Sequence, residues 1–112
     1  LSPDEIGLEM VANSNNTEVM FIINKPDGFE SVEYELSYEA NDRANPGNRV
    51  TRGVAGEDDL SNGPYESEDL FLGTCSSGTC IPDTGVEQVD LLLILTKSDG
   101  KKFQVEDSLA IE

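Results

Sequence analysis

The sequence predicts an all-β fold, a sandwich of two antiparallel sheets with about seven strands in a single domain over residues 1–112. Three observations predict it. Apolar and polar residues alternate with a period of two in several segments, as in half-buried strands. No segment sustains apolar residues at helical spacing. Clusters of Gly, Pro, Asn and Asp separate the alternating segments, and such clusters are typical of turns.

The clearest strand is predicted at residues 31–40. Alternate positions from Val32 to Ala40 are apolar, and the positions between them are Glu or Ser. Because side chains alternate across a strand, Tyr34, Leu36 and the other apolar residues share one face. A row of carboxylates occupies the opposite face.

The C-terminal part contains a predicted hairpin. Residues 88–96 include the apolar run from Leu91 to Leu95, which is typical of a central strand covered on both faces. Residues 102–111 alternate again, and Asp99-Gly100 between the two segments is a strong hairpin signal. Asp107 interrupts the apolar face of the last segment, which predicts a bulge or a bend there.

The remaining strands are marked less evenly. Residues 5–12 alternate and are followed by an Asn-rich turn. The apolar run from Val19 to Ile23 predicts a second strand over 18–25, and residues 65–72 form a further candidate strand. Residues 41–64 are rich in Asn, Asp, Gly and Pro, so we expect a loosely structured segment with only a short strand over 49–55. Loops of such length are uncommon and are usually functional or mobile.

These segments resemble fibronectin type III and related immunoglobulin-like domains. Val32 to Tyr38 is similar to the third strand of that family, and the Leu91–Leu95 strand with the final hairpin is similar to its last two strands. The chain departs from the family in having no Trp. The segment from Phe71 to Cys80 is similar to loops of secreted bacterial sandwich domains, which implies a surface protein and no particular activity.

The two cysteines, Cys75 and Cys80, are separated by four residues in a predicted hairpin of small residues. A catalytic dithiol usually has two intervening residues, and a structural zinc site would need further Cys or His ligands. The chain has no histidine. We therefore predict a local disulfide, with free thiols, redox use or metal binding as alternatives, and an extracellular or cell-surface location.

The charge is strongly acidic, with 23 Asp and Glu against 7 Lys and Arg and a formal net charge of −16. Nucleic-acid binding requires a clustered basic face, so we expect no nucleic-acid partner. The longest apolar run is too short to span a bilayer, which predicts no direct membrane insertion in this segment. The acidity fits a solvated extracellular surface, adaptation to high salt or binding of divalent cations.

The acidic segment over residues 57–69 is a candidate calcium site, and calcium is the one cofactor that the sequence suggests. Its oxygen-bearing side chains are those of Asp58, Asp59, Asn62, Glu66, Glu68 and Asp69. An EF-hand is excluded, because Leu60 stands where the third position requires an oxygen ligand and no helices flank the loop. An exposed acidic loop is the alternative.

The row of Glu33, Glu35 and Glu39 is a second acidic feature. Basic residues of neighbouring segments are candidates to neutralise it, namely Lys25, Lys97, Lys101 and Arg52. If they do not, the row predicts a cationic partner surface.

The residue types argue against catalysis. Without histidine a Ser–His or Cys–His relay is excluded, and a flat strand face supplies no cleft, so we predict that the protein is not an enzyme. We predict a structural, adhesive or assembly module that acts through protein–protein contacts, with a protein partner or by self-assembly. The alternative is a calcium- or carbohydrate-binding module that uses the 57–69 segment, with Tyr65 and Phe29 as the candidate aromatic contacts for a sugar.

Overall fold

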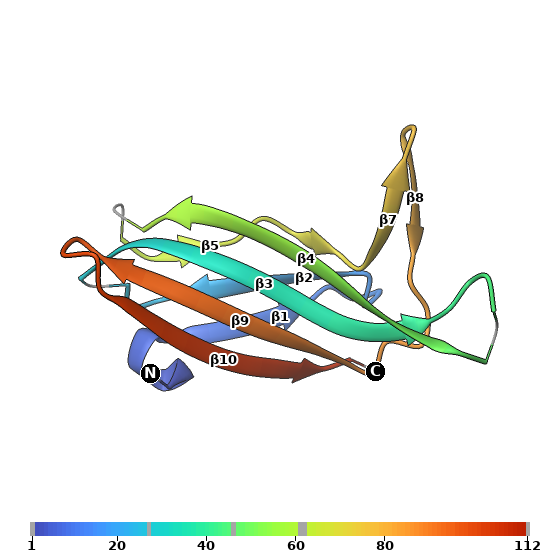
Figure 1. Ribbon diagram of the computed structural model, residues 1–112, viewed down its shortest axis with the longest axis horizontal. Coiled ribbons are helices and arrows are strands. Elements are labelled where there is room, and N and C mark those ends of the chain that lie inside the picture. The colour runs from blue at the N-terminus through green and yellow to red at the C-terminus, as the bar shows by residue number, and fades with distance from the viewer. Residues whose placement is uncertain (1, 27, 46, 61–62, 112) are drawn as a thin grey trace.

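The computed structural model describes residues 2–26, 28–45, 47–60 and 63–111. Two antiparallel sheets pack against each other around one hydrophobic core, and a separate two-stranded hairpin projects from them (Figure 1). The predicted all-β sandwich is therefore confirmed.

The first sheet, sheet A, contains the strands of the N-terminal half and two short later strands. After a 3-10 helix (Pro3–Ile6), β1 (Leu8–Ala12) pairs with β2 (Glu18–Ile23), which also pairs with β5 (Tyr65–Glu66) and β6 (Leu70–Phe71). One strand was predicted over 65–72, but the structure has two. Ser67 lies buried between them, and its hydroxyl accepts a hydrogen bond from the Phe21 N–H at 2.9 Å.

The second sheet, sheet B, has the order β10–β9–β3–β4. These strands span Lys102–Ala110, Gln88–Lys97, Phe29–Asn41 and Arg49–Asp59, respectively. The predicted C-terminal hairpin is confirmed as β9 and β10. The bulge predicted at Asp107 is wrong, because Asp107 pairs in unbroken register with Leu91; the register shifts between Phe29 and Ser31 instead.

The prediction of a loosely structured segment over 41–64 is also wrong. The eleven residues of β4 pair with β3 from Asn41 opposite Arg49 to Ser31 opposite Asp59. The inward positions of β4 hold Arg52, Val54 and Gly56 rather than a run of large apolar residues, which hides the strand pattern. Gly56 is required there, since a Cβ atom would overlap the side chain of Tyr34.

The core lies between the inner faces of the two sheets. Phe21 of β2 is buried and contacts Tyr34 of β3 edge to face, with ring centroids 5.3 Å apart. The predicted inner face of β3 is confirmed, because Val32, Tyr34, Leu36 and Tyr38 are all buried. Burial of the apolar surface on these strands supplies the main stabilisation of the fold.

Strand β9 is covered on one face only. Val89, Leu91, Leu93 and Leu95 are buried, whereas the alternate side chains Leu92 and Ile94 are only partly buried. The predicted cover on both faces is therefore wrong, since no further layer of the described residues lies over the outer face of sheet B.

Candidate functional site

The candidate site is the outer face of sheet B, which we call the acidic face. It is formed by the outward side chains at the middle of the four strands: Glu33, Glu35, Ala55, Glu57, Asp90, Leu92, Ile94 and Glu106. The carboxylates are exposed, and Leu92 and Ile94 are half-buried. The face thus presents a small apolar centre within a carboxylate border.

The strand register explains this arrangement. Glu35 lies opposite Leu92 of β9 on one side and Ala55 of β4 on the other, and Leu92 lies opposite Glu106 of β10. One row further along, Glu33 lies opposite Glu57 and Ile94. Period-two alternation and the register together place acidic and apolar groups from four strands on one surface.

Two shallow, open hollows cover the middle of the acidic face. One, of about 580 Å³, is lined by Asp90, Leu92 and Glu106, and the other, of about 460 Å³, by Glu33, Glu57 and Ile94. Glu35 and Leu92 border both. Such open depressions fit contact with another protein surface better than enclosure of a small molecule.

Within the described residues, no carboxylate of the acidic face forms an ion pair with a basic side chain. Across the described residues the ion pairs are Arg43 and Arg52 with Asp83, and Lys101 with Asp99. None of them involves the acidic face. Like charges directly opposite each other on neighbouring strands, as Glu33 and Glu57 are, destabilise a sheet.

None of the basic residues expected to neutralise Glu33, Glu35 and Glu39 forms an ion pair with them in the described residues. The Lys97 ammonium lies over the rings of Phe29 and Phe103, at 5.6 and 5.1 Å from their centroids. Arg52 and Lys101 face Asp83 and Asp99 as described above, and Lys25 takes part in none of the ion pairs found in the described residues.

The proposed calcium ligands are spread over several elements. Asp58 and Asp59 end β4, Glu66 belongs to β5, and Glu68 and Asp69 lie between β5 and β6. Asn62 lies outside the described residues. Within the described ranges no group of three or more acidic, His or Cys side chains is placed to hold a metal ion. Asp58 instead accepts a hydrogen bond from the Tyr65 hydroxyl at 3.1 Å.

The two aromatic residues proposed for sugar contact are packed within the fold. Tyr65 contacts Phe21, with ring centroids 5.8 Å apart, and Phe29 contacts Phe103 at the same distance. Both residues are partly buried. Neither presents an open aromatic platform.

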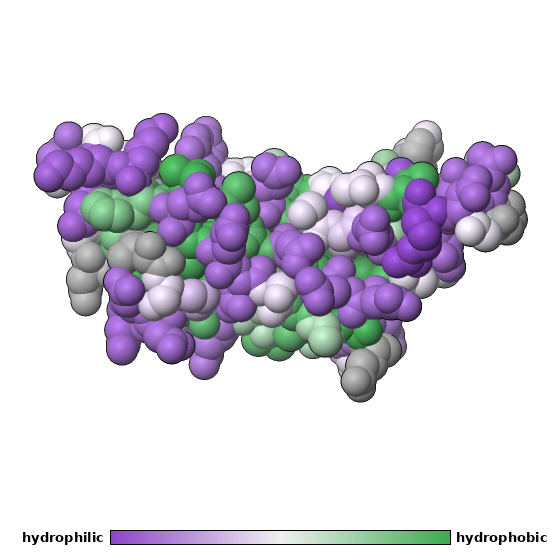
Figure 2. All heavy atoms as spheres, turned by 60° about the horizontal axis from the view of Figure 1, so that its bottom comes forward, coloured by the Kyte–Doolittle hydropathy of each residue, from purple (hydrophilic) through white to green (hydrophobic). Residues whose placement is uncertain are grey.

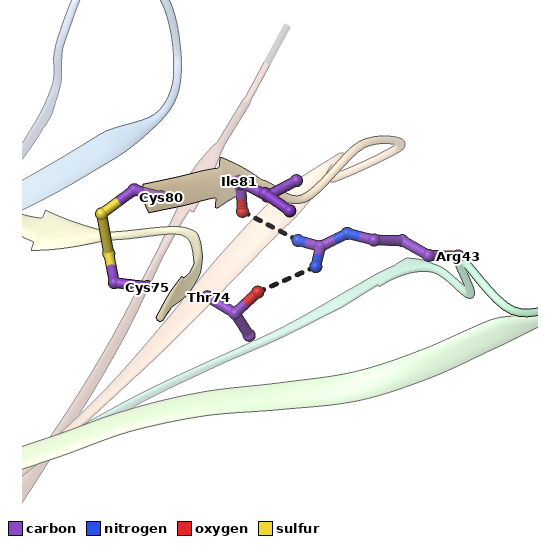
Figure 3. The surroundings of a disulfide bond; sticks show 5 residues. All are labelled: Arg43, Thr74, Cys75, Cys80 and Ile81. Atoms are coloured by element: carbon purple, nitrogen blue, oxygen red, sulfur yellow. Dashed lines mark hydrogen bonds between the residues drawn. A yellow bond between two sulfur atoms is a disulfide. The ribbon is translucent and has the colours of Figure 1, made fainter. Parts of the chain in front are cut away.

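The disulfide prediction is confirmed. Cys75 of β7 (Gly73–Ser76) and Cys80 of β8 (Thr79–Pro82) are directly opposite each other and bonded. The hairpin stands away from the sandwich (Figure 1). Arg43 holds its base by donating hydrogen bonds of 2.8 Å to the Thr74 hydroxyl and the Ile81 carbonyl (Figure 3).

A buried carboxylate fixes the chain where the hairpin rejoins the sandwich. The Asp83 side chain is fully buried and accepts hydrogen bonds of 2.8 Å from the Tyr38 hydroxyl and from Arg43. The Nε atom of Arg52 lies 3.5 Å from the same carboxylate and has no hydrogen bond. Arg49 adds a hydrogen bond to the carbonyl of Gly85.

This network went unpredicted, because Asp83 lies in a loop-like stretch with no periodic pattern. The network bears on the acidic face because it occupies basic side chains. The three arginines of the chain, Arg43, Arg49 and Arg52, are all engaged at the base of the hairpin. Within the described residues, none of the three arginines therefore forms an ion pair with a carboxylate of the acidic face. Hydrophilic residues with patches of hydrophobic surface between them cover much of the side drawn in Figure 2.

Reduction of the disulfide is expected to leave the fold standing. Loop closure over so few residues stabilises by about 2 kcal/mol on the chain-entropy model, and the contacts of Arg43 still hold the hairpin base. Addition of reductant should lower the melting temperature modestly and keep the far-ultraviolet circular dichroism of the strands. Complete unfolding on reduction would contradict the prediction that the disulfide stabilises the hairpin only locally.

All three tyrosines should resist ionisation in the folded protein. Burial raises the pKa of Tyr34, Tyr38 and Tyr65 above the ordinary value of 10.0, and hydrogen bonds to Asp83 and Asp58 raise those of Tyr38 and Tyr65 further. Because the folded protein holds these protons more tightly than the unfolded chain does, protonated tyrosine stabilises the fold fully below pH 10, the ordinary tyrosine pKa. This contribution is lost as the pH rises through the higher pKa values of the folded state. Tyrosinate absorbance should therefore lag behind that of the urea-unfolded chain; coincident titration curves would contradict the packing.

Among the described residues, no helix has the length and apolar character needed to cross a membrane. Comparison of the chain with protein-family models, curated proteins and solved structures found no match in any of the three.

Proposed function

We propose that the chain is a non-catalytic adhesion or assembly module of an extracellular or cell-surface protein. In this proposal it binds a cationic protein partner through the acidic face. The disulfide supports the location, since such bonds persist in oxidising compartments.

We also propose an immunoglobulin-like or fibronectin type III-like relationship, which the strand order supports. β3, β9 and β10 share one sheet while β1, β2 and β5 share the other, as strands C, F, G and A, B, E do in immunoglobulin-like sandwiches. β4 lies beside β3, where variable-type domains place their additional strand.

The observation that carries the proposed binding role is the carboxylate border around Leu92 and Ile94, whose members form no ion pair within the described residues. Protein interfaces combine an apolar centre with a polar rim, and complementary charge increases the association rate and excludes wrong partners. A second copy of this chain would bring a further net charge of −16 against the face. The surface therefore favours a basic partner over self-assembly through this face.

The test is calorimetric titration with a short poly-L-lysine peptide at low salt. Replacement of Glu33, Glu35 and Glu57 by Gln should weaken binding roughly tenfold, if each lost charge pair contributes about 0.5 kcal/mol. Added salt should weaken binding to the unchanged protein, because exposed charges are screened.

The matched control removes three carboxylates outside sheet B, with Asp4→Asn, Glu66→Gln and Asp69→Asn. It has the same net charge as the acidic-face variant. The proposal expects the control to retain most of the binding. Equal loss in both variants would mean that only the net charge matters, and the acidic face would then not be the site.

A calcium- or carbohydrate-binding role for the 57–69 segment has less support. Asp58 is engaged by Tyr65, and no described cluster gathers three acidic ligands. A rise in melting temperature on addition of millimolar calcium would favour this alternative, because a ligand bound only by the folded state stabilises it.

A further inference from the structure

The outer edge of β4 is open. β4 is the last strand of sheet B, and within the described residues no strand pairs with its other side. In an antiparallel ladder alternate residues of an edge strand direct their N–H and C=O groups away from the neighbouring strand. Over the eleven residues of β4, this leaves a row of backbone donors and acceptors without a ladder partner.

The other edges of the sandwich have features that block strand addition. β10 carries Lys102 and Glu106, and its Asp107 lies on the inner face. β1 has five residues, and β5 and β6 have two each. Charged side chains, inward charges and short length are the usual protections of sheet edges.

The centre of β4, over residues 53–56, has none of these protections, although Arg52 and Asp58 occupy inward positions on either side of it. Residues 53–56 are Gly, Val, Ala and Gly, with no charge and no proline, and the register with β3 is continuous along the whole strand. An unguarded stretch within a long edge strand is a template for a further strand. The charges of β4 lie toward its ends, at Arg49, Arg52, Glu57, Asp58 and Asp59.

We propose that β4 is the site at which an extended segment of the cationic partner adds to sheet B. The inference rests on the proposed function and specifies the partner. Side chains on one side of the added segment would extend the acidic face beside Ala55 and Glu57, which favours Lys or Arg. Those on the other side would lie beside Val54, which is half-buried and favours apolar residues. The partner segment therefore alternates basic and apolar residues.

The experiment uses a short peptide of alternating Lys and Val as the probe. Amide hydrogen exchange is measured on the isotopically labelled protein with and without the peptide. Outward-directed amides within residues 53–57 should exchange at least several-fold more slowly in the complex, because strand addition hydrogen-bonds them. A peptide with the same side chains but N-methylated at alternate residues cannot form the ladder and should give no such protection.

Proline substitution supplies a second test. Adjacent residues of a strand direct their N–H groups to opposite sides. Of the two variants Val54→Pro and Ala55→Pro, one therefore removes a backbone hydrogen bond to β3, and the other removes only an N–H group at the free edge. The variant that keeps the circular dichroism of the fold should bind the Lys–Val peptide roughly tenfold more weakly, with every carboxylate retained. Unchanged affinity in that variant would overturn the inference.

The outcomes separate this inference from the proposed function. Suppose that the Lys–Val peptide and its N-methylated form both bind in a salt-dependent way, and that the β4 amides are not protected from exchange. This result would overturn strand addition and leave the acidic face as the binding surface. Protection of β10 or β1 in place of β4 would also overturn it. No binding of either peptide at low salt would overturn both proposals. If both proline variants unfold, the exchange measurement alone decides.

Discussion

Replacement of Asp83 by Ala is expected to destabilise the protein by about 3 kcal/mol, because it removes the shared acceptor of a buried network. The Tyr38 hydroxyl and the guanidinium groups of Arg43 and Arg52 all face this carboxylate. Loss of one partner of a buried ion pair leaves the other charges uncompensated, at a typical cost of 3–5 kcal/mol. We take the lower end, since the two arginine side chains are about one-third exposed.

Asp99→Ala is the matched control. Asp99 and Lys101 approach to 4.0 Å, but both side chains are largely exposed, so this ion pair contributes little. Urea unfolding should show a cost of about 1 kcal/mol or less for the control. Equal destabilisation of the two variants would contradict the anchoring role of Asp83.

The combined replacement of Glu33 and Glu57 by Gln is expected to change stability and binding in opposite directions. The two carboxylates lie opposite each other with no described ion pair, so their removal should stabilise the fold by roughly 0.2–1 kcal/mol. The same change should weaken binding of poly-L-lysine about fivefold, at about 0.5 kcal/mol for each charge. A surface kept at a cost in stability is typical of a functional site.

Its control is Glu66→Gln with Asp69→Asn, which removes the same charge from outside sheet B. The free energy of unfolding and the affinity for poly-L-lysine should both change less in the control than in the acidic-face variant. A double variant of the acidic face that loses stability, or one that binds as tightly as the unchanged protein, would contradict the interpretation of these carboxylates.

Alternation in the sequence was sufficient to predict the inner faces of β3 and β10. Leu36 and Val105 occupy predicted inward positions and are buried, because a period of two has only two possible phases and the apolar residues select one. The hairpin of Cys75 and Cys80 was predictable for a similar reason, since few residues separate the two thiols.

The features that escaped prediction depend on contacts distant in sequence. β4 pairs along its full length with β3, yet its inward positions include Arg52, whose partner Asp83 is far along the chain. Leu92 and Ile94 were expected under a covering layer, but nothing in the sequence indicates that sheet B has one open face. The acidic face was only half predicted, because the row on β3 was visible and its neighbours on β4, β9 and β10 were not.

The most direct test of the account is nuclear magnetic resonance mapping of the isotopically labelled protein during titration with poly-L-lysine. The account predicts that the largest shift changes lie at the middle of sheet B, around Glu35, Ala55, Leu92 and Glu106. Shift changes spread evenly over all exposed carboxylates, or gathered on sheet A, would contradict the acidic face as the binding surface.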